Sequence, residues 1–421
     1  MVVELINTGS ELMLGRILNT HQQWLCQQLA DLGYVVTRQV AVPDTGTDIQ
    51  GAVRESLTRA DLVLVTGGLG PTSDDLTRDL LAQMLGRPLH LDPTVLAHIT
   101  QFVEARRRRM PERTRVQAMV PEGAMVLANP NGTAPGLALE LNPNPLRRDQ
   151  RASWLVLLPG PPRELRPMFS DSVVPLLGRV LPAEGVFVCR TLRATGIGES
   201  LVEEKVAPLL EPLVGTGLDL GYCARPGQVD VRMSGRGSGA AALVARAEAL
   251  VRQALGRFVY GTDDEELEQT LVALLTEHRQ TLAVAESCTG GCIAHRLTNV
   301  PGASAVLLAG LVTYSNAAKQ KFLGVRAETL AEHGAVSEAV ARQMAEGARR
   351  ETGADYALSV TGIAGPGGGS AAKPVGTVFV GLAGNFPTVV EQYSNPWDRE
   401  TFKQVTAQQA MDLLRRKMQQ E

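Results

Sequence analysis

Short apolar segments alternate with amphipathic ones along the first third of the chain. In the segment that begins at Thr20, Leu25, Leu29 and Leu32 share one helical face, and Gly33 supplies a stop signal. The pattern predicts strands at residues 2–9, 34–42 and 61–68, and helices at 20–32, 49–60 and 76–86. The third strand is almost wholly apolar, as in a parallel sheet covered on both faces. This alternation predicts a doubly wound α/β domain over residues 1–175.

A change in composition at residues 181–185 indicates a linker to a second module. The pattern beyond it predicts a strand at 186–194, a helix at 200–211, a hairpin at 221–235 and a long helix at 240–255. Pro226 and Gly227 supply the turn of the hairpin. These elements form a small α+β connector over residues 183–260. We interpret it as structural, because its sequence has no cluster of histidines, cysteines or carboxylates.

Residues 263–421 alternate strands and helices in a different pattern. Leu267, Leu271, Leu274 and Leu275 keep helical spacing in a segment that begins at Asp264. The pattern then predicts strands at 281–287, 305–314 and 355–362, helices at 315–324 and 337–353, a closing hairpin at 377–394, and a helix after Asp398. This last part is a second α/β domain.

Length and composition are typical of a globular protein with several domains. The chain has 421 residues, more than one ordinary core accommodates. The longest apolar stretch, residues 305–314, is far shorter than the roughly 18 residues that a membrane span needs. Glu4 interrupts the first apolar run, and no basic segment precedes it, so no secretory signal is visible. We therefore expect a soluble protein of the cytoplasm.

Charge and cysteine content narrow the choice of partners. The net charge is −3 and aromatic residues make up 4% of the chain, both of which argue against nucleic acid as the main partner. The arginine-rich run at 104–110 is interpreted as the solvated face of a helix. The five scattered cysteines include no CxxC pair, which fits a reducing compartment without a disulfide framework or a zinc site.

Glycine-rich turns and an acidic pair follow the strands of the first domain. Ligands of open α/β sheets gather beyond the carboxyl ends of the strands. The segments there are 8–11, 66–72, 130–136 and 158–165, and their candidate ligand residues are Gly67, Gly68, Gly70 and Thr72. Glycines let backbone amides approach a phosphate, and the neighbouring Asp74 and Asp75 suggest a divalent cation such as Mg²⁺. The alternative is that the two aspartates cap a helix.

In the last domain, Ser287 and Cys288 lie together where a strand turns into a helix. Helix-terminal amides there could hold an oxyanion. A serine nucleophile needs a base, no histidine lies in a comparable loop, and Lys319 follows the neighbouring strand. Spacing alone favours a surface position for Lys319. Cys288 is the competing nucleophile, with a packed small side chain as its structural interpretation.

These motifs together resemble the CinA (competence/damage-inducible protein A) family. The resemblance covers nearly the whole chain. The segments TGSELMLG, GGLGPTSDDLT, NGTAPG and LPGPPREL resemble its N-terminal domain, which is similar to molybdopterin-binding proteins. The segments AESCTGG, VTYSNAAK, GAVSEAV, GIAGPGGG and KPVGTV resemble its C-terminal amidase domain. The middle segment is similar to the KH-like connector of the family, without a basic GxxG loop. The chain departs from the family at His21, where members commonly carry Asn.

The resemblance implies two hydrolytic activities on breakdown products of NAD. The C-terminal domain would convert nicotinamide mononucleotide to nicotinate mononucleotide and ammonia without a cofactor. Ser287 would be the nucleophile, with Lys319 and Tyr314 sharing proton transfer. The implied substrate contacts of this domain are Thr289, Gly290, Gly365, Gly367, Gly368 and Arg399. The N-terminal domain would hydrolyse ADP-ribose with Mg²⁺, Mn²⁺ or Co²⁺ near Asp74 and Asp75.

Two other functions compete with this pyridine-nucleotide salvage enzyme. One is a non-catalytic, protein-binding scaffold in DNA uptake or recombination, as the name of the family suggests. The other keeps the amidase and makes the first domain a binding module for a pterin or a nucleotide. In each case we expect no membrane partner, and the resemblance implies a homodimer.

Overall fold

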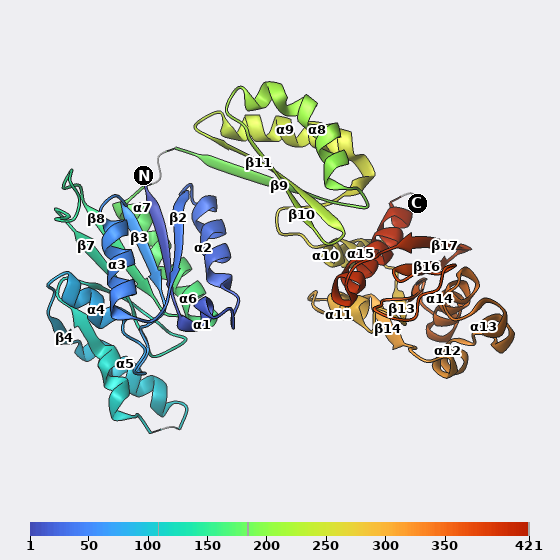
Figure 1. The fold of residues 1–421 in the computed structure, drawn as a ribbon, viewed down its shortest axis with the longest axis horizontal. Helices are drawn as coiled ribbons and strands as arrows, with labels where there is room; N and C mark the ends of the chain where they lie inside the picture. Colours follow the sequence, from blue (N-terminus) through green and yellow to red (C-terminus); the bar gives the residue numbers. More distant parts are fainter. Residues whose placement is uncertain (108, 183–184, 420–421) are drawn as a thin grey trace. The chain divides into compact units, whose positions relative to one another are not determined.

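The computed structural model describes residues 1–107, 109–182 and 185–419. The chain divides into two compact units, Met1–Phe187 and Val188–Glu421 (Figure 1). Part of the expected linker, residues 183–184, lies outside the described residues. No helix in the described part of the chain is long and apolar enough to cross a membrane.

The first unit is an α/β domain built on a six-stranded sheet of order β2-β1-β3-β8-β7-β6. The strands are β1 (Val3–Thr8), β2 (Val36–Val42), β3 (Leu62–Thr66), β6 (Met125–Leu127), β7 (Gly136–Leu141) and β8 (Ser153–Leu158). The first three and β8 pair in parallel, whereas β7 and β6 are antiparallel. The predicted doubly wound fold is confirmed, and the antiparallel edge adds strands that periodicity did not identify.

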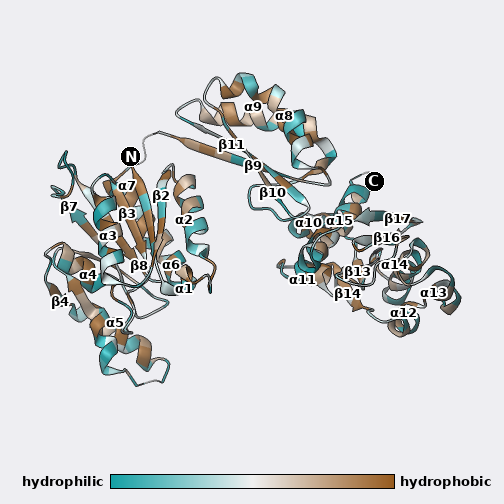
Figure 2. Ribbon diagram, viewed as in Figure 1, coloured by the Kyte–Doolittle hydropathy of each residue, from teal (hydrophilic) through white to brown (hydrophobic). Residues whose placement is uncertain are grey.

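Helices cover both faces of this sheet. One core contains Leu25, Leu29 and Leu165, and the other contains Ile49 and Leu81. The α-helices are α1 (Ser10–Met13), α2 (Thr20–Asp31), α3 (Gly46–Leu57), α4 (Thr77–Met84), α5 (Pro93–Glu104), α6 (Pro162–Met168) and α7 (Val174–Val180). The domain also has the 3-10 helix η1 (Glu112–Ala118), the π-helix η2 (Phe169–Val173) and a small antiparallel pair of strands, β4 (Leu89–Leu91) and β5 (Met119–Pro121). Figure 2 shows the central strands as the most apolar part of the domain.

Arg106, Arg107 and Arg109 of the arginine-rich run at 104–110 lie outside helix α5. Helix α5 ends at Glu104, and the chain turns at Arg106 and Arg107, where Arg107 has a positive φ of 53°. The Arg106 guanidinium lies 3.5 Å from the centre of the Phe102 ring. The helical expectation is therefore wrong for these residues, because the helix ends before them. Arg108 lies outside the described residues.

The second unit begins with the connector, a four-stranded sheet of order β10-β11-β9-β12 under two helices. Its elements are β9 (Phe187–Thr195), α8 (Glu199–Val214), β10 (Asp219–Arg225), β11 (Gln228–Arg236), α9 (Ala240–Leu255), η3 (Gly256–Phe258) and β12 (Val259–Thr262). The hairpin turns at Pro226 and Gly227, as the sequence predicts.

The last domain carries a five-stranded sheet of order β14-β13-β15-β16-β17. Its elements are α10 (Leu267–His278), β13 (Leu282–Glu286), α11 (Cys292–Thr298), η4 (Ala303–Ala305), β14 (Leu307–Val312), α12 (Asn316–Leu323), α13 (Ala327–His333), α14 (Glu338–Thr352), β15 (Tyr356–Gly362), β16 (Thr377–Gly384), β17 (Phe386–Ser394) and α15 (Arg399–Met418). Helices α10, α11 and α15 pack on one face, and α12 and α14 pack on the other. The predicted closing hairpin is confirmed: β16 and β17 pair antiparallel, and β16 joins the sheet antiparallel to β15.

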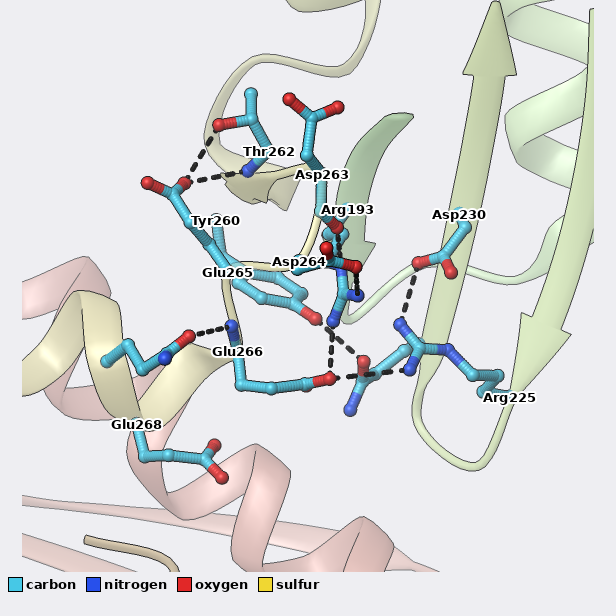
Figure 3. Close-up of polar contacts among 12 residues, drawn as sticks. Arg193, Arg225, Asp230, Tyr260, Thr262, Asp263, Asp264, Glu265, Glu266 and Glu268 are labelled. Atoms are coloured by element: carbon cyan, nitrogen blue, oxygen red, sulfur yellow. Dashed lines mark hydrogen bonds and ion pairs between the residues drawn. The ribbon is translucent and has the colours of Figure 1, made fainter. Parts of the chain in front are cut away.

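Ion pairs join the connector to the start of helix α10 (Figure 3). Arg193 of β9 is buried and donates to the carboxylate of Glu266, which Arg225 also approaches at 3.5 Å. Glu266 is the N-cap of α10 in a capping box with Gln269. The same carboxylate therefore begins a helix of the last domain and pairs with arginines of the connector.

Candidate functional site

Ser287 lies on a turn that the sheet and a buried carboxylate hold in place. Its backbone amide donates to the carbonyl of Val360 in β15 at 3.0 Å. The preceding residue, Glu286, is 1% exposed, and its carboxylate accepts the amides of Gly291 and Ala294 at the start of α11. A carboxylate in this position satisfies amides that a helix start leaves free. The turn is therefore fixed by groups other than the Ser287 hydroxyl.

Lys319 faces Ser287 from helix α12. Its Nζ atom lies 3.0 Å from the Oγ atom of Ser287 and donates to the carbonyls of Thr313 at 2.9 Å and Tyr314 at 3.3 Å. Lys319 is 1% exposed, so the surface position that spacing favoured is wrong. Burial disfavours the charged amine and lowers the pKa of Lys319 from its ordinary value.

Tyr314 and Arg399 close one side of the site. The Arg399 guanidinium donates to the Tyr314 hydroxyl at 2.7 Å and to the carbonyl of Gly365 at 2.8 Å. These residues come from the segment after β14, the start of α15 and the glycine-rich loop after β15. One cation thus holds together three segments that are far apart in the sequence.

A cavity of about 290 Å³ opens beside Ser287. The predicted site residues that line it are Ser287, Tyr314, Lys319, Gly365, Gly367, Gly368 and Arg399. Two other predicted contacts, Thr289 and Gly290, do not belong to its wall. Thr289 is fully buried behind the turn, and its hydroxyl has no hydrogen-bond partner within the described residues.

Cys288 also touches this cavity, but its thiol is buried in the apolar core of the domain. Burial raises the pKa of Cys288 to about 12. Because the thiolate is the nucleophilic form, a thiol with this pKa is unreactive near neutral pH. The geometry therefore favours Ser287 over Cys288 as the nucleophile.

Sequence reasoning missed Asn316 and Thr361, which also line the cavity. Thr361 lies at the carboxyl end of β15, beside the end of β13 that leads to Ser287. The rule that ligands gather beyond the carboxyl ends of strands could have identified it. Asn316 begins helix α12, and no signal in the sequence distinguished it from a helix-start residue.

A second cavity, of about 380 Å³, lies in the first unit beyond the carboxyl ends of β1, β3 and β8. The four predicted glycine- and proline-rich segments meet there. The lining residues from them are Thr8, Gly9, Glu11, Gly67, Gly68, Leu69, Gly70, Pro71, Thr133, Ala134, Pro159, Gly160, Pro161 and Glu164. Residues as far apart in the chain as Thr8 and Glu164 therefore line the same cavity.

The glycines of the 66–72 loop permit close packing against the start of α4. A Cβ atom on Gly68 would lie 2.1 Å from the Thr77 hydroxyl, and one on Gly70 would lie 2.3 Å from the Asp75 carboxylate. At Gly68, whose φ is +66°, a side chain would be both strained and crowded, whereas at Gly70 it would require the Asp75 carboxylate to move. Thr72 does not line the cavity; its backbone amide donates to the Asp75 carboxylate at 2.9 Å.

Five carboxylates line this cavity. They belong to Glu11, Asp44, Asp74, Asp75 and Glu164. Helix α4 begins after Leu76 without a side-chain cap, so the aspartates do not cap it. No group of three histidines, cysteines or carboxylates among the described residues is close enough to enclose a metal ion by itself.

A magnesium-like ion that is shared with a bound phosphate fits this arrangement. Mg²⁺ is usually bound by one or two carboxylates together with water and substrate phosphates. Asp74 and Asp75 offer such carboxylates beside the glycine loop. Sequence reasoning missed Asp44 and Glu164, which come from a turn and from helix α6, because neither lies in a recognisable acidic pair.

His21 lies outside this cavity wall. Its Nε2 atom contacts the carbonyl of Gly160, and its Nδ1 atom has no partner within the described residues. Burial lowers the pKa of His21, so the neutral ring is favoured. This places His21 behind the Gly160 loop, in a supporting position.

Two α/β domains with separate polar cavities, joined by a KH-like connector, define a protein with two candidate sites. Three family models match in the same order along the chain. They are "Probable molybdopterin binding domain" at residues 4–179, "Damage-inducible protein CinA KH domain" at 189–261 and "CinA C-terminal domain" at 264–418.

Two relatives match nearly the whole length of this chain. A competence-damage inducible protein of Caldicellulosiruptor bescii is 44% identical over 99% of both chains. A CinA-like protein of Akkermansia muciniphila is 45% identical over 97% of this chain and 95% of that one. The crystal structure of competence/damage inducible protein CihA from Agrobacterium tumefaciens is 42% identical and covers 35% of this chain and 91% of that one, with a TM-score of 0.34. The chain belongs to the CinA family of competence-damage inducible proteins.

Proposed function

We propose that the C-terminal domain hydrolyses the carboxamide of nicotinamide mononucleotide to nicotinate mononucleotide and ammonia. The observation that carries this proposal is the buried amine of Lys319, 3.0 Å from the Ser287 hydroxyl at the wall of a cavity. An amine whose pKa is lowered by burial can accept a proton, as an activated serine requires. No carboxylate approaches the Lys319 amine among its hydrogen-bond partners.

The hydrogen bonds of Lys319 suit a neutral amine. A neutral amine has two N–H bonds and one lone pair. In the structure the Lys319 amine donates to Ser287 Oγ as well as to the two carbonyls; in the neutral form that the proposal requires, the carbonyls of Thr313 and Tyr314 would accept its two N–H bonds, and the lone pair would take the Ser287 proton. Lys319 would take this proton while the Oγ atom of Ser287 bonds to the carboxamide carbon.

The first half of the reaction forms an acyl-enzyme. The carbonyl oxygen becomes an oxyanion. The amides of Cys288 and Thr289 are candidate donors to it: neither donates to a carbonyl among the described residues, although both lie beside the Cys288 sulfur. The C–N bond then breaks. The leaving nitrogen takes up a proton from Lys319 and departs as ammonia. Tyr314 would relay this proton, and Arg399 would orient its hydroxyl.

The second half restores the serine. A water molecule gives a proton to Lys319 and adds to the acyl carbon. The ester bond then breaks, and Ser287 regains its proton from Lys319. The products are a carboxylic acid and the free enzyme, so the atoms of one water and one amide are all accounted for.

For the N-terminal domain we propose metal-dependent hydrolysis of ADP-ribose. The support is the acidic cavity beside the Gly67–Gly70 loop. The backbone of that loop would bind the diphosphate, and Asp74 and Asp75 would hold Mg²⁺, Mn²⁺ or Co²⁺. When bound, the metal would neutralise charge on the diphosphate. Both proposed substrates derive from NAD, which makes the whole chain a cytoplasmic, homodimeric salvage enzyme in this proposal.

One experiment separates this proposal from a scaffold in DNA uptake. Purified protein is assayed for ammonia release from nicotinamide mononucleotide, beside a gel-shift titration with DNA. Ammonia release without a shift supports the amidase. A shift without ammonia release supports the scaffold and contradicts the proposal. Hydrolysis of ADP-ribose with and without chelator then distinguishes an active first domain from a binding module.

A further inference from the structure

A second cation lies one turn beyond Arg399 on helix α15. Residues four apart on a helix share a face, so Lys403 faces the same way as Arg399, which lines the cavity. The Nζ atom of Lys403 lies 3.9 Å from the position that a Cβ atom on Gly290 would take. Gly290 belongs to the nucleophile turn, because its amide donates to the carbonyl of Ser287 at 3.1 Å. Lys403 therefore lies beside the turn that carries Ser287.

Lys403 has no hydrogen-bond or ion-pair partner within the described residues, although it is partly buried. The other two cations near Ser287 are occupied. Lys319 is buried against Ser287, and Arg399 holds Tyr314 and Gly365. A partly desolvated ammonium without an acceptor favours the binding of an anion.

We propose that Lys403 binds the phosphate of the nucleotide whose carboxamide reacts at Ser287. This inference rests on the proposed amidase function. The carboxamide and the phosphate stand at opposite ends of the substrate, so the phosphate needs a cation outside the catalytic group of Ser287 and Lys319. A lysine on a flexible stem binds phosphate as a point charge. The open backbone at Gly290, which is exposed and has no side chain, leaves room for the phosphate beside the ammonium.

The test compares two substrates that differ only in the phosphate. Ammonia release from nicotinamide mononucleotide and from nicotinamide riboside is measured for the wild-type chain and for Lys403→Gln, Lys403→Arg and Lys417→Gln. Lys417 lies on the same helix, with its ammonium 4.5 Å from the centre of the Phe386 ring, and controls for the loss of one positive charge. If the protein binds nicotinamide riboside but does not hydrolyse it, the affinity for the riboside is measured as its inhibition constant against hydrolysis of nicotinamide mononucleotide.

For Lys403→Gln we expect KM for the mononucleotide to rise about tenfold or more, because a charge-assisted hydrogen bond is lost. We expect kcat, and both constants for the riboside, to stay within about twofold. Lys403→Arg restores most of the affinity, and Lys417→Gln behaves as wild type.

Two outcomes would contradict the role of Lys403 and leave the proposed amidase activity supported. One is an unchanged KM for the mononucleotide in Lys403→Gln. The other is an equal loss with both substrates, which would mean that Lys403 supports the turn rather than the phosphate. A wild-type chain that releases no ammonia from either substrate overturns the proposed function itself, and the inference with it.

Discussion

The amine of Lys319 lies 3.0 Å from the hydroxyl of Ser287, and the two residues come from helix α12 and the turn after strand β13. Both residues are buried: Lys319 is 1% exposed and Ser287 is 9% exposed. A lysine so far removed from water, without a carboxylate partner, favours its neutral form. This relationship underlies the predictions for the C-terminal domain.

Ser287→Ala should reduce ammonia release by about a thousandfold or more, because Ser287 is the only hydroxyl among the described cavity-lining residues that contacts the Lys319 amine. Cys288→Ala should keep most of the activity, since the pKa of about 12 leaves the Cys288 thiol protonated. Initial rates with nicotinamide mononucleotide measure both. A loss in Cys288→Ala, or on alkylation of Cys288, as complete as that in Ser287→Ala would assign the nucleophile to the thiol.

Tyr314→Phe should lower kcat by about tenfold and leave its pH dependence in place, because the change removes a proton relay and not the base. The Tyr314 side chain is 60% exposed, so the fold should be unaffected. The pH profile of kcat for this variant is the measurement. Disappearance of the ionisation in Tyr314→Phe would assign the titrating group to the tyrosine instead.

Replacing both aspartates of the first cavity, Asp74→Asn with Asp75→Asn, should abolish metal-dependent hydrolysis of ADP-ribose. Ammonia release should be unchanged, because Ser287 lies in the other compact unit. Asp75 also accepts the Thr72 amide, so a melting curve must accompany the assay. Unchanged hydrolysis of ADP-ribose in a folded double variant would rule out the metal site.

Most elements of the fold could be predicted from the sequence, because their signals are local. Ser337 caps helix α14 and Gly353 ends it, as the pattern indicates. The predictions that fail concern residues whose burial depends on packing between elements far apart in the sequence. Lys319 has the spacing of a surface lysine, yet it is buried, since helix α14 packs against α12 and the end of β14 lies beside it.

In the candidate site, too, features with a local sequence signal could be predicted, and contacts between distant residues could not. The turn at Ser287 and the glycine-rich loops were visible as motifs. The contact between Arg399 and Tyr314 joins residues 85 positions apart, and periodicity carries no information on such a pairing. The family resemblance supplied the roles of Lys319 and Arg399. It also pointed to Thr289 and Gly290, which are not among the residues that line the cavity; Thr289 is buried and Gly290 is exposed.

The buried amine should also affect stability. The pKa of Lys319 is lower in the folded chain than its ordinary value of 10.5. At pH values between the pKa in the folded chain and 10.5, the unfolded chain therefore binds more protons than the folded chain does. The stability of the wild-type protein should therefore rise with pH across that interval and level off above it. Lys319→Met should lack this rise, so its stability relative to wild type should fall as the pH increases. The free energy of unfolding of both proteins can be measured with denaturant at several pH values. If it changed with pH in the same way for wild type and Lys319→Met, the lowered pKa would be contradicted.

The measurement that tests the central claim most directly is kcat and KM of wild type and Lys319→Met as a function of pH. If Lys319 is the base, kcat of the wild type rises with pH through an ionisation below 10.5. In Lys319→Met this ionisation disappears and kcat falls by about 10²–10⁴-fold. A Lys319→Met variant with a raised KM and an intact kcat would show that the lysine only holds substrate, and would contradict the account.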